Sequence, residues 1–457
     1  MELSDFSDLG LKQALYANLA TLGYTRMTPI QAAALPPILA ARDVIGQGKT
    51  GSGKTAAFGL GLLQSLDSKK FCIQALVLCP TRELSDQVAL EIRRLARGIH
   101  NIKVLSLCGG RPLGPQVDSL RHGAHIIVGT PGRIDDHLNK GNLSFQHLRT
   151  LVLDEADRML DMGFAPVIDG IVSRLPSERQ TLLFSATFPP DINNLSRRVM
   201  QAPTLVQLEE QHDGSSIEQA ACLVPDGPDR AEALAAILLE RRPDTALVFC
   251  NTRRDTQFVA RMLGNQGFAA LALHGELEQR ERDEILAKFT GRAISILIAT
   301  DVAARGLDID NIDAVINYQP ARDSDTHLHR IGRTARAGNP GYALTLYSNG
   351  ETYRIERMEQ TLGTAFPRLP VPTPAGPAYK PPMVLLQVDG GRRQKLRPGD
   401  ILGALTGDAG IAAERIGKIQ IMTNCTYVAV RRQQAEDALQ ALGDGKIKGR
   451  SFRAREV

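Results

Sequence analysis

The chain of 457 residues contains no tryptophan and only six cysteines, none of them spaced as C-x-x-C. Most of these cysteines lie in apolar runs such as Leu76–Cys79. This spacing argues against a disulfide framework, and we expect buried thiols in a reducing compartment.

No apolar run approaches the roughly 18 residues that a membrane-spanning helix needs. The first residues, Met1–Asp5, show neither the basic nor the apolar region of a signal peptide. Hydrophobic residues make up 43% of the chain, which is enough for packed cores without disulfides. We expect a cytoplasmic, monomeric protein that makes no contact with a membrane.

The chain as a whole carries no large excess of positive or negative charge, since its net charge is +4. Residues 379–457 nevertheless hold 14 Lys and Arg against 8 Asp and Glu, a net of +6, and the rest of the chain has a net of −2. A basic segment attached to a near-neutral body is typical of an appendage that binds a polyanion such as a nucleic acid.

Helical segments alternate with short apolar segments, which indicates parallel sheets covered by helices. The alternation runs through residues 1–208, stops in a polar stretch at 209–216 and begins again over 217–366. Residues 367–382 contain seven prolines and predict an extended, semi-rigid linker. Residues 383–457 follow the order β-α-β-β-α-β of a split βαβ unit, which is also the order of the RRM. The predicted fold class is α/β, with two parallel-sheet lobes in tandem and a small α+β domain.

Two motifs predict a nucleotide site. Residues 48–55 read Gly-Lys-Thr-Gly-Ser-Gly-Lys-Thr and fit G-x-x-x-x-G-K-[ST], a loop whose backbone N–H groups hold phosphates between a strand and a helix. Residues 154–157 read Asp-Glu-Ala-Asp and follow a predicted buried strand, at whose end ligands bind in open α/β sheets. Taken alone, the first motif also fits an ordinary turn and the second a solvated helix start. Together they predict a triphosphate site in which Lys54 reaches the phosphates and Thr55 holds Mg²⁺.

These and neighbouring motifs resemble those of the DEAD-box RNA helicases of superfamily 2 over residues 6–345. The resemblance implies two RecA-like lobes, ATP and Mg²⁺ as cofactors, and RNA as the partner. Residues 23–31 with the upstream Phe6 resemble the Q motif, in which the glutamine reads the adenine edge and the aromatic residue stacks on it; alone, Gln31 fits a surface glutamine. Gly48 stands where the family usually has alanine, and the phosphate-loop pattern is still satisfied. The nucleotide-binding residues that the resemblance implies are Phe6, Tyr24, Gln31, Thr50, Gly51, Ser52, Gly53, Lys54, Thr55 and Asp308.

The resemblance also implies catalytic roles. Asp154 would hold Mg²⁺ through water, and Glu155 would act as general base or position the attacking water. Asp157 would couple to the segment Ser185–Thr187, which resembles the helicase motif that joins hydrolysis to RNA remodelling. The catalytic residues implied are Lys54, Asp154, Glu155, Arg333 and Arg336, the metal-holding residues are Thr55 and Asp154, and the coupling residues are Asp157, Ser185, Thr187 and His329.

Residues 329–336 resemble helicase motif VI. Arg333 and Arg336 are three residues apart, so on a helix they share one face, and planar guanidinium groups suit the oxygens of a transferring phosphoryl group. The alternative for these arginines is a solvated basic helix face. Because ATP would contact both lobes, we expect its binding to favour a closed state.

The remaining helicase motifs imply an RNA track whose hydroxyl groups, arginines and helix N-termini contact phosphates and sugars. Taken singly, these residues also fit loop glycines and capping threonines. The track comprises Pro80, Thr81, Arg82, Gly110, Thr130, Arg133, Asn251, Thr252, Gln279, Arg282, Thr300 and Arg305.

Residues 395–408, 416–419 and 445–449 resemble the RRM-type tail of one group of bacterial DEAD-box proteins. That resemblance implies binding to a hairpin of 23S rRNA near the peptidyl-transferase centre and a role in assembly of the large ribosomal subunit. Leu385 and Leu386 stand where an RRM carries a stacking aromatic residue, so we expect recognition to rely mainly on basic residues. The alternative for those basic residues is a solubilising surface. The RNA-binding residues predicted here are Arg392, Arg393, Lys395, Arg397, Lys418, Tyr427, Lys446, Lys448 and Arg450.

The sequence therefore predicts an ATP-dependent RNA helicase. It leaves open an ATP-gated RNA clamp or annealing chaperone, because both activities need ATP-driven closure. A DNA helicase is disfavoured by the match to the RNA helicase motifs.

Overall fold

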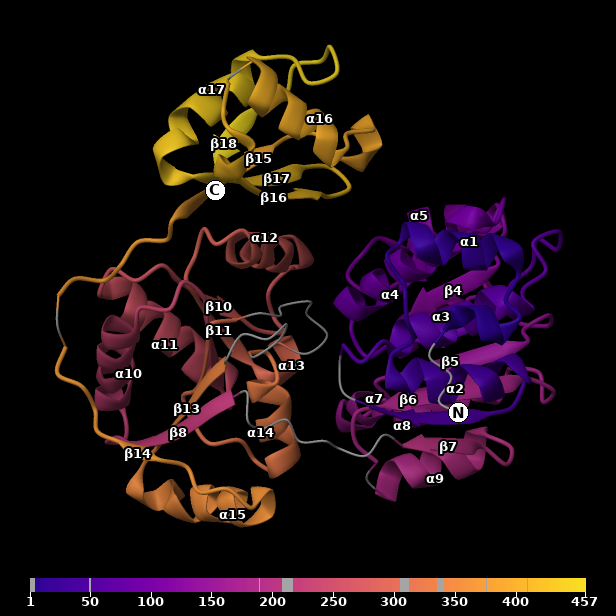
Figure 1. The fold of residues 1–457 in the computed structure, drawn as a ribbon, viewed down its shortest axis with the longest axis horizontal. Helices are drawn as coiled ribbons and strands as arrows, with labels where there is room; N and C mark the ends of the chain where they lie inside the picture. The colour runs from indigo at the N-terminus through magenta and orange to yellow at the C-terminus, as the bar shows by residue number, and fades with distance from the viewer. Residues whose placement is uncertain are drawn as a thin grey trace. The chain divides into compact units, whose positions relative to one another are not determined.

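The computed structural model describes residues 5–48, 51–188, 190–207, 217–304, 312–334, 341–374, 376–408 and 410–457. The chain divides into two compact units. The first holds a seven-stranded sheet, and the second holds another seven-stranded sheet together with a four-stranded sheet formed by the C-terminal residues (Figure 1). The predicted fold class, with two RecA-like parallel sheets and a small α+β domain, is confirmed.

The strands of the first sheet pair in parallel, in the order β3-β4-β2-β5-β6-β1-β7. Their bounds are β1 Val44–Gln47, β2 Ala75–Leu78, β3 Val104–Leu107, β4 Ile126–Gly129, β5 Thr150–Asp154, β6 Gln180–Ser185 and β7 Thr204–Gln207. The α-helices are α1 Gln13–Thr21, α2 Pro29–Leu39, α3 Lys54–Ser65, α4 Arg82–Leu95, α5 Leu113–Arg121, α6 Pro131–Asn139, α7 Ala156–Asp161, α8 Ala165–Val172 and α9 Pro190–Val199. The short apolar segments of this lobe form its strands, and the predicted helix after the phosphate loop begins at Lys54 itself.

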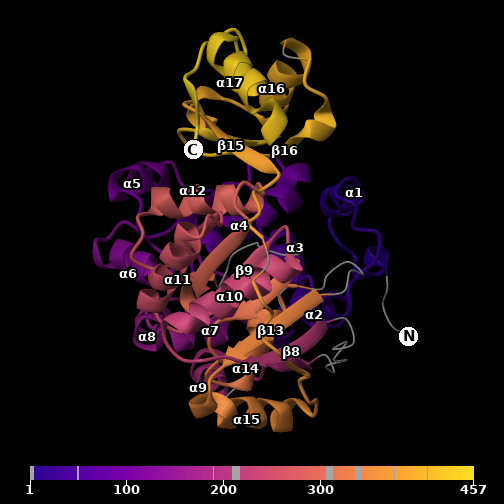
Figure 2. The same ribbon diagram turned by 90° about the vertical axis from the view of Figure 1, so that its left-hand side faces the viewer.

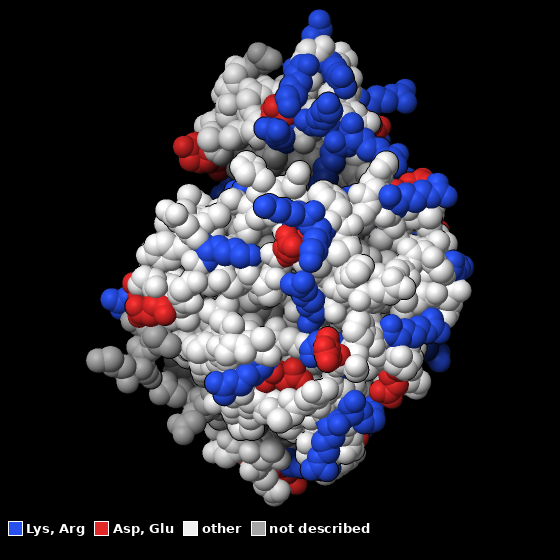
Figure 3. Space-filling view, turned by 90° about the vertical axis from the view of Figure 1, so that its right-hand side faces the viewer, with Lys and Arg blue, Asp and Glu red and all other residues white. Residues whose placement is uncertain are grey.

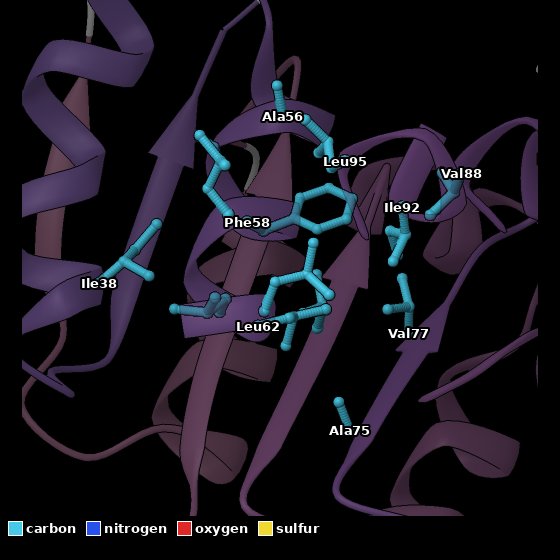
Figure 4. Close-up of a cluster of buried hydrophobic side chains, with 14 of the residues drawn as sticks. Ile38, Ala56, Phe58, Leu62, Ala75, Val77, Val88, Ile92 and Leu95 are labelled. Carbon is cyan, nitrogen blue, oxygen red and sulfur yellow. The ribbon is translucent and has the colours of Figure 1, made fainter. Parts of the chain in front are cut away.

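Both faces of this sheet are covered, because neighbouring side chains on a strand point to opposite faces. Val77 of β2 packs into one core with Phe58 and Leu62 of α3, as Figure 4 shows. Leu76 and Leu78 of the same strand pack into the core on the other face. Strands β2, β4 and β5 are buried at every residue, which is typical of a parallel sheet between two helical layers. The sheet is therefore a rigid support for the residues at its carboxyl edge.

The second sheet is also parallel, in the order β10-β11-β9-β12-β13-β8-β14. Its strands are β8 Ile217–Leu223, β9 Ala246–Cys250, β10 Ala270–Leu273, β11 Ile296–Thr300, β12 Ala314–Asn317, β13 Gly341–Tyr347 and β14 Arg368–Leu369. The α-helices are α10 Pro228–Arg241, α11 Arg253–Asn265, α12 Gln279–Thr290, α13 Asp301–Ala304, α14 Ser324–Ile331 and α15 Thr352–Leu362. Strand β14 lies inside the predicted proline-rich linker, whose Tyr379 also packs edge-on against Phe268 of this lobe. The predicted linker segment therefore packs against the second lobe through Leu369, Ala378 and Tyr379.

The small domain contains β15 Met383–Val388, α16 Pro398–Gly403, β16 Ile416–Ile421, β17 Thr426–Arg431, α17 Ala435–Asp444 and β18 Ala454–Glu456. Its sheet is antiparallel in the order β16-β17-β15-β18. Figure 2 shows α16 and α17 together on one side of β15 and β16. The predicted β-α-β-β-α-β order is confirmed. The first helix is short, and the chain continues from Ala404 to Asp408 as a π-helical turn.

The two faces of the small sheet have different neighbours. Val384, Leu386 and Val388 of β15 face a core with α16 and α17. Leu385 of β15 and Tyr427 of β17 pack with Ala287 of α12 in a second cluster. Within the same unit, the side chain of Gln420 donates to Thr290 Oγ1 of α12 at 2.6 Å. The face on which an RRM stacks bases is therefore covered by a helix of the second lobe.

Four of the six cysteines, Cys79, Cys108, Cys222 and Cys250, are buried, in line with the prediction of buried thiols. Burial raises the pKa of each of these four thiols. Among the described residues, no helix is both long enough and apolar enough to cross a membrane.

A buried histidine makes the stability of the second lobe depend on pH. The Nε2 atom of His327 in α14 lies 3.0 Å from Gln219 Oε1, and its Nδ1 atom has no hydrogen-bond partner among the described residues. Burial, together with the charge of Arg330, lowers the pKa of His327 to about 4. The unfolded chain binds a proton at the ordinary pKa of 6.5, so the free energy of unfolding should fall as the pH drops from 6.5 to 4. The expected slope is at most about 1.4 kcal/mol per pH unit.

The variant His327→Gln tests this slope, because glutamine keeps a donor for Gln219 and does not titrate. Urea unfolding of the full chain and the variant should give midpoints that converge as the pH falls through this range. Two parallel curves would contradict the assignment to His327.

Candidate nucleotide and RNA sites

The phosphate loop connects β1 to α3, so the N-terminus of a twelve-residue helix faces the loop. Gly53 caps this helix with φ at +96°, a conformation that glycine adopts without strain. A Cβ atom at Gly53 would lie 2.6 Å from Gln31 Nε2, so a side chain there would collide with the Q-motif residue. Lys54, the first residue of α3, donates to the carbonyl of Gly48 and is 7% exposed. Thr50 lies outside the described residues.

Gln31 joins the Q motif to this loop. Its Oε1 accepts from the backbone N–H of Thr28 at 2.9 Å, and its Nε2 donates to Gly53 O at 3.2 Å. Both contacts bury the amide, which is 1% exposed, so Gln31 is not an ordinary surface glutamine. Phe6 is also buried and meets Tyr24 edge-on, with ring centroids 6.2 Å apart, and the Tyr24 hydroxyl donates to Glu91 at 2.8 Å. The stacking of Phe6 on adenine remains a prediction.

The acidic motif lies where β5 turns into α7. Asp154 is the last residue of β5, and Glu155 adopts a left-handed conformation, with φ at +52°, before the helix starts. A non-glycine residue in this conformation costs about 1 kcal/mol or more and is often found at functional sites. Both Asp154 and Glu155 are almost fully buried at this turn.

Charges at this site are concentrated in a small buried volume. Burial and the neighbouring Glu155 raise the pKa of Asp154 to about 7, while Lys54 opposes the shift. Burial lowers the pKa of Lys54, against the attraction of Asp154, Glu155 and Asp157. A group of carboxylates and the Thr55 hydroxyl supply the hard oxygen donors that Mg²⁺ prefers, and a cation would offset the burial of Asp154. The residues present therefore fit the expected metal ion.

Strand β6 connects the two halves of this site, because it lies between β1 and β5 in the sheet. At its end, the carbonyl of Ser185 accepts from the N–H of Gly48 at 3.0 Å. Two residues later, Thr187 donates to Asp157 Oδ2 through its N–H at 3.1 Å and its hydroxyl at 3.0 Å. The predicted contact between Asp157 and the Ser185–Thr187 segment is present, and the same segment also contacts the phosphate loop.

Motif VI lies at the end of α14 in the second unit. Ile331 is the last residue of α14 and Gly332 is its C-cap. Arg333 lies in the turn that follows, so the expectation that it lies on a helical face is wrong. Arg333 is 5% exposed, which also rules out a solvated basic face for this residue. Arg336 and the ribose residue Asp308 lie outside the described residues. His329 is half-buried within α14.

Sequence reasoning missed Arg330, which connects the strand ends of the second sheet. Its guanidinium forms a two-point ion pair with Asp301 at 2.6 and 2.8 Å. It also donates to Asn251 at 2.7 Å, to Asn317 at 3.1 Å and to the carbonyl of Gln319 at 3.0 Å. All five guanidinium N–H groups thus have an acceptor, in β12, in the loops after β9 and β12, or at the start of α13. Arg330 fixes motif VI to the segment that carries the predicted RNA contact Asn251.

In the first unit, the RNA-track residues lie at two helix N-termini. Helices α4 and α6 start after the neighbouring strands β2 and β4, and Thr81 caps α4 by accepting from Leu84 N–H at 3.2 Å. A side chain at Gly110 would collide with the guanidinium of Arg82, so these two residues are adjacent. Arg133 of α6 donates at 3.1 Å to the carbonyl of Arg111, the residue after Gly110, so the start of α6 lies beside the same loop. Pro80 is buried, whereas Thr81, Arg82, Gly110, Thr130 and Arg133 are half-buried or exposed.

In the second unit, Thr252 caps α11 by accepting from Asp255 N–H at 3.1 Å, and Asn251 precedes it. Thr300 ends β11, which is the strand beside β9. Gln279 and Arg282 lie in the first turn of α12, where Arg282 donates to the carbonyl of His274 at 3.4 Å. Arg305 lies outside the described residues.

The basic residues predicted in the small domain gather on two loops that lie side by side. The first loop, residues 392–397, follows β15, and the second, residues 446–450, precedes β18. Lys448 of the second loop donates to Lys395 O of the first at 3.1 Å and pairs with Asp400 at 3.1 Å. We call residues 392–397 and 446–450 the basic loop pair. In Figure 3, Lys and Arg side chains gather on the small domain at the top of the view.

The basic loop pair and the sheet face differ in exposure. The strand residue Lys418 and all the basic residues of the two loops are exposed. The exposed loop residues are Arg392, Arg393, Lys395, Arg397, Lys446, Lys448 and Arg450. Tyr427, in contrast, is 2% exposed in the cluster with Ala287. A base could stack on this ring only if the sheet left α12, so the loops are the accessible RNA-binding candidates.

Comparisons with known proteins agree with this geometry. The family model of the DEAD/DEAH box helicases matches residues 28–195, that of the helicase conserved C-terminal domain matches 229–338, and that of the DbpA RNA binding domain matches 385–456. The matched ranges follow the three sheets in order.

Individual relatives extend the similarity to the whole chain. The chain is 50% identical over 455 residues to the ATP-dependent RNA helicase DbpA of Escherichia coli, covering 99% of both chains. It is 41% identical to the DEAD-box ATP-dependent RNA helicase CshA of Geobacillus kaustophilus, over 81% of this chain and 79% of that protein. A solved structure, Saccharomyces cerevisiae Dbp5 bound to RNA and ADP BeF3, is similar with a TM-score of 0.73 and 28% sequence identity. The match covers 80% of this chain and 96% of the Dbp5 chain. The chain belongs to the DEAD-box ATP-dependent RNA helicases of the DbpA type.

Proposed function

We propose that this helicase remodels 23S rRNA during assembly of the large ribosomal subunit, and that its small domain directs it to an rRNA hairpin near the peptidyl-transferase centre. The observation that carries the proposal is the basic loop pair, because it is exposed and joined by Lys448 into one surface. The match of the small domain to the DbpA RNA binding domain supports the same assignment. Two loops of fixed relative position suit a folded hairpin better than a flexible basic tail would.

In the proposed hydrolysis, the oxygen of a water molecule bonds to the γ-phosphorus of ATP while the bond from that phosphorus to the bridging oxygen breaks. Glu155 accepts a proton from the water, and Lys54 offsets the charge of the phosphate oxygens. Mg²⁺, held by Thr55 and through water by Asp154, would supply further positive charge to the phosphates when bound. Asp157 and Thr187 connect the acidic motif to the end of β6 and so transmit its position.

The proposed RNA track supplies the second half of the cycle. Threonine hydroxyls and helix N-termini at the carboxyl edge of each sheet would hold RNA phosphates without reading sequence. Arg330 joins Asn251 to motif VI by a hydrogen bond, and we propose that this contact links the RNA track to Arg333. We propose that ATP and RNA together stabilise the state in which Arg333 and Arg336 reach the γ-phosphate.

The targeting step is tested by removing a single loop charge. Lys446 is exposed, and its side chain makes no hydrogen bond or ion pair with the part of the chain that the structure describes, so Lys446→Ala should weaken hairpin binding without disturbing the fold. The salt slope of hairpin affinity should become less steep by about one unit, because one fewer phosphate contact releases counterions. Lys448→Ala should have a larger effect that includes loss of the contact with Asp400.

The measurement is a salt titration of the full chain on the rRNA hairpin and on an unrelated hairpin of equal length, with RNA-stimulated ATP hydrolysis on each. Lys69→Ala, an exposed lysine of the first unit, is the matched control and should leave both readouts unchanged. Equal affinity of the unaltered chain for the two hairpins would refute specific targeting.

A further inference from the structure

The acidic motif contains a buried ion pair. Arg158 NH1 donates to Glu155 Oε2 at 2.9 Å, and the two side chains are only 3% and 8% exposed. Glu155 is the N-cap residue of α7 and Arg158 lies in the first turn of that helix, so the ion pair closes over the helix start. The structure thus gives the predicted general base a cationic partner within its own turn.

Burial makes this pair different from the ion pairs on the surface. An arginine stays charged, and a buried charge without a partner is strongly unfavourable, so Arg158 and Glu155 depend on each other. The exposed pair of Arg121 with Asp118 has the same spacing, at 3.2 Å, but its side chains are 75% and 69% exposed and it contributes little. The buried pair is therefore expected to fix the Glu155 side chain in one position.

Lys54 supplies an alternative partner that would misplace Glu155. It lies near enough for the charge of Glu155 to act on it. A carboxylate released from Arg158 would be drawn toward this ammonium group, which the phosphates of ATP also require. Holding one oxygen of Glu155 on Arg158 keeps the carboxylate in place and leaves Lys54 for the phosphates.

The rest of the turn holds Arg158 itself. The backbone N–H of Arg158 donates to Asp157 Oδ1 at 3.0 Å. The other oxygen of that carboxylate accepts from Thr187. Arg158 is therefore connected on one side to the predicted base and on the other to the segment that contacts the phosphate loop.

We propose that Arg158 is a positioning residue for ATP hydrolysis, holding Glu155 in the orientation in which it accepts the proton of the attacking water. The inference rests on the proposed role of Glu155 as the base. Arg158 acts through Glu155 and contacts neither ATP nor water in this role. It should therefore affect the chemical step and leave nucleotide binding almost unchanged.

The first test separates kcat from binding. Arg158→Gln should lower kcat on the order of 10²-fold, the loss expected when a reacting group is misplaced by about 1 Å. The KM for ATP should change by less than about threefold, because the contacts that bind the phosphates remain. Arg158→Lys should recover most of the loss, since the contact is a single N–H donor and a lysine keeps the charge. Arg121→Gln is the control from the exposed pair and should leave both constants unchanged.

A double-mutant cycle covers the case in which Arg158→Gln folds poorly because Glu155 is left unpaired. The double variant Glu155→Gln with Arg158→Gln removes both charges, and its kcat should equal that of Glu155→Gln alone if Arg158 acts only through Glu155. A further loss in the double variant would overturn the inference, as would a kcat for folded Arg158→Gln within about threefold of the unaltered enzyme. If Glu155→Gln itself kept nearly full activity, the proposed base would be wrong and the inference would fall with it. Loss with Glu155→Gln and none with Arg158→Gln would refute the inference alone.

Discussion

Glu155→Gln should lower ATP hydrolysis by about 10²–10⁴-fold, the contribution of a general base, while ATP binding persists. Glutamine has nearly the shape of glutamate and keeps an oxygen that can accept from Arg158, so the buried arginine stays paired. It cannot take the proton of the attacking water. The variant should therefore bind ATP and RNA together and release the RNA slowly, because the step that ends the bound state is blocked.

The measurement is the half-life of the RNA complex with ATP, compared with that of the unaltered chain under the same conditions. Lys54→Ala is the contrasting variant, because it removes the buried cation of the phosphate loop and should abolish turnover without trapping RNA. A rate of hydrolysis near that of the unaltered chain in Glu155→Gln would show that Glu155 is not the base.

The sequence was sufficient to predict where the main site residues lie. The phosphate loop, the acidic motif and Ser185 each follow a short apolar strand, and parallel strands bring their carboxyl ends to one edge of a sheet. That rule holds whatever the details of packing, because it depends only on strand direction. The positions of Lys54, Asp154 and Asp157 could therefore be predicted before any contact was known.

Pairwise contacts between distant residues could not be predicted in the same way. Arg330 follows His329 in motif VI, and no spacing rule indicates that its guanidinium meets Asp301, which lies 29 positions earlier. Arg158 follows the acidic motif directly, and its burial depends on how α7 packs rather than on local pattern. Buried polar groups find partners through the tertiary fold, so their importance appears only once the fold is built.

The covered face of the small sheet did leave a signal in the sequence. Met383 and Leu385 alternate with Val384 and Leu386 along β15, so both faces of this strand are apolar. A strand that is apolar on both faces is typically buried on both. The resemblance to an RRM-type tail placed Tyr427 among the RNA-binding residues, whereas the apolar alternation of β15 fits the second layer that covers its ring.

Arg333→Ala should lower kcat by about 10³–10⁵-fold, the range known for arginine fingers, and Arg336→Ala should act in the same direction. The turn that carries Arg333 is held to Ile312 by two hydrogen bonds, since Ile312 N–H donates to the Arg333 carbonyl at 3.4 Å and Thr334 Oγ1 donates to Ile312 O at 2.5 Å. A fixed turn suits a group that must meet a transferring phosphoryl group at one position. Arg333→Lys should keep the charge and still lose most of the rate, because an ammonium group lacks the planar fork. The decisive measurement is kcat at saturating ATP and RNA, with urea unfolding of each variant to confirm that the second lobe is folded. A loss below about tenfold in folded Arg333→Ala would assign this buried arginine a structural role instead.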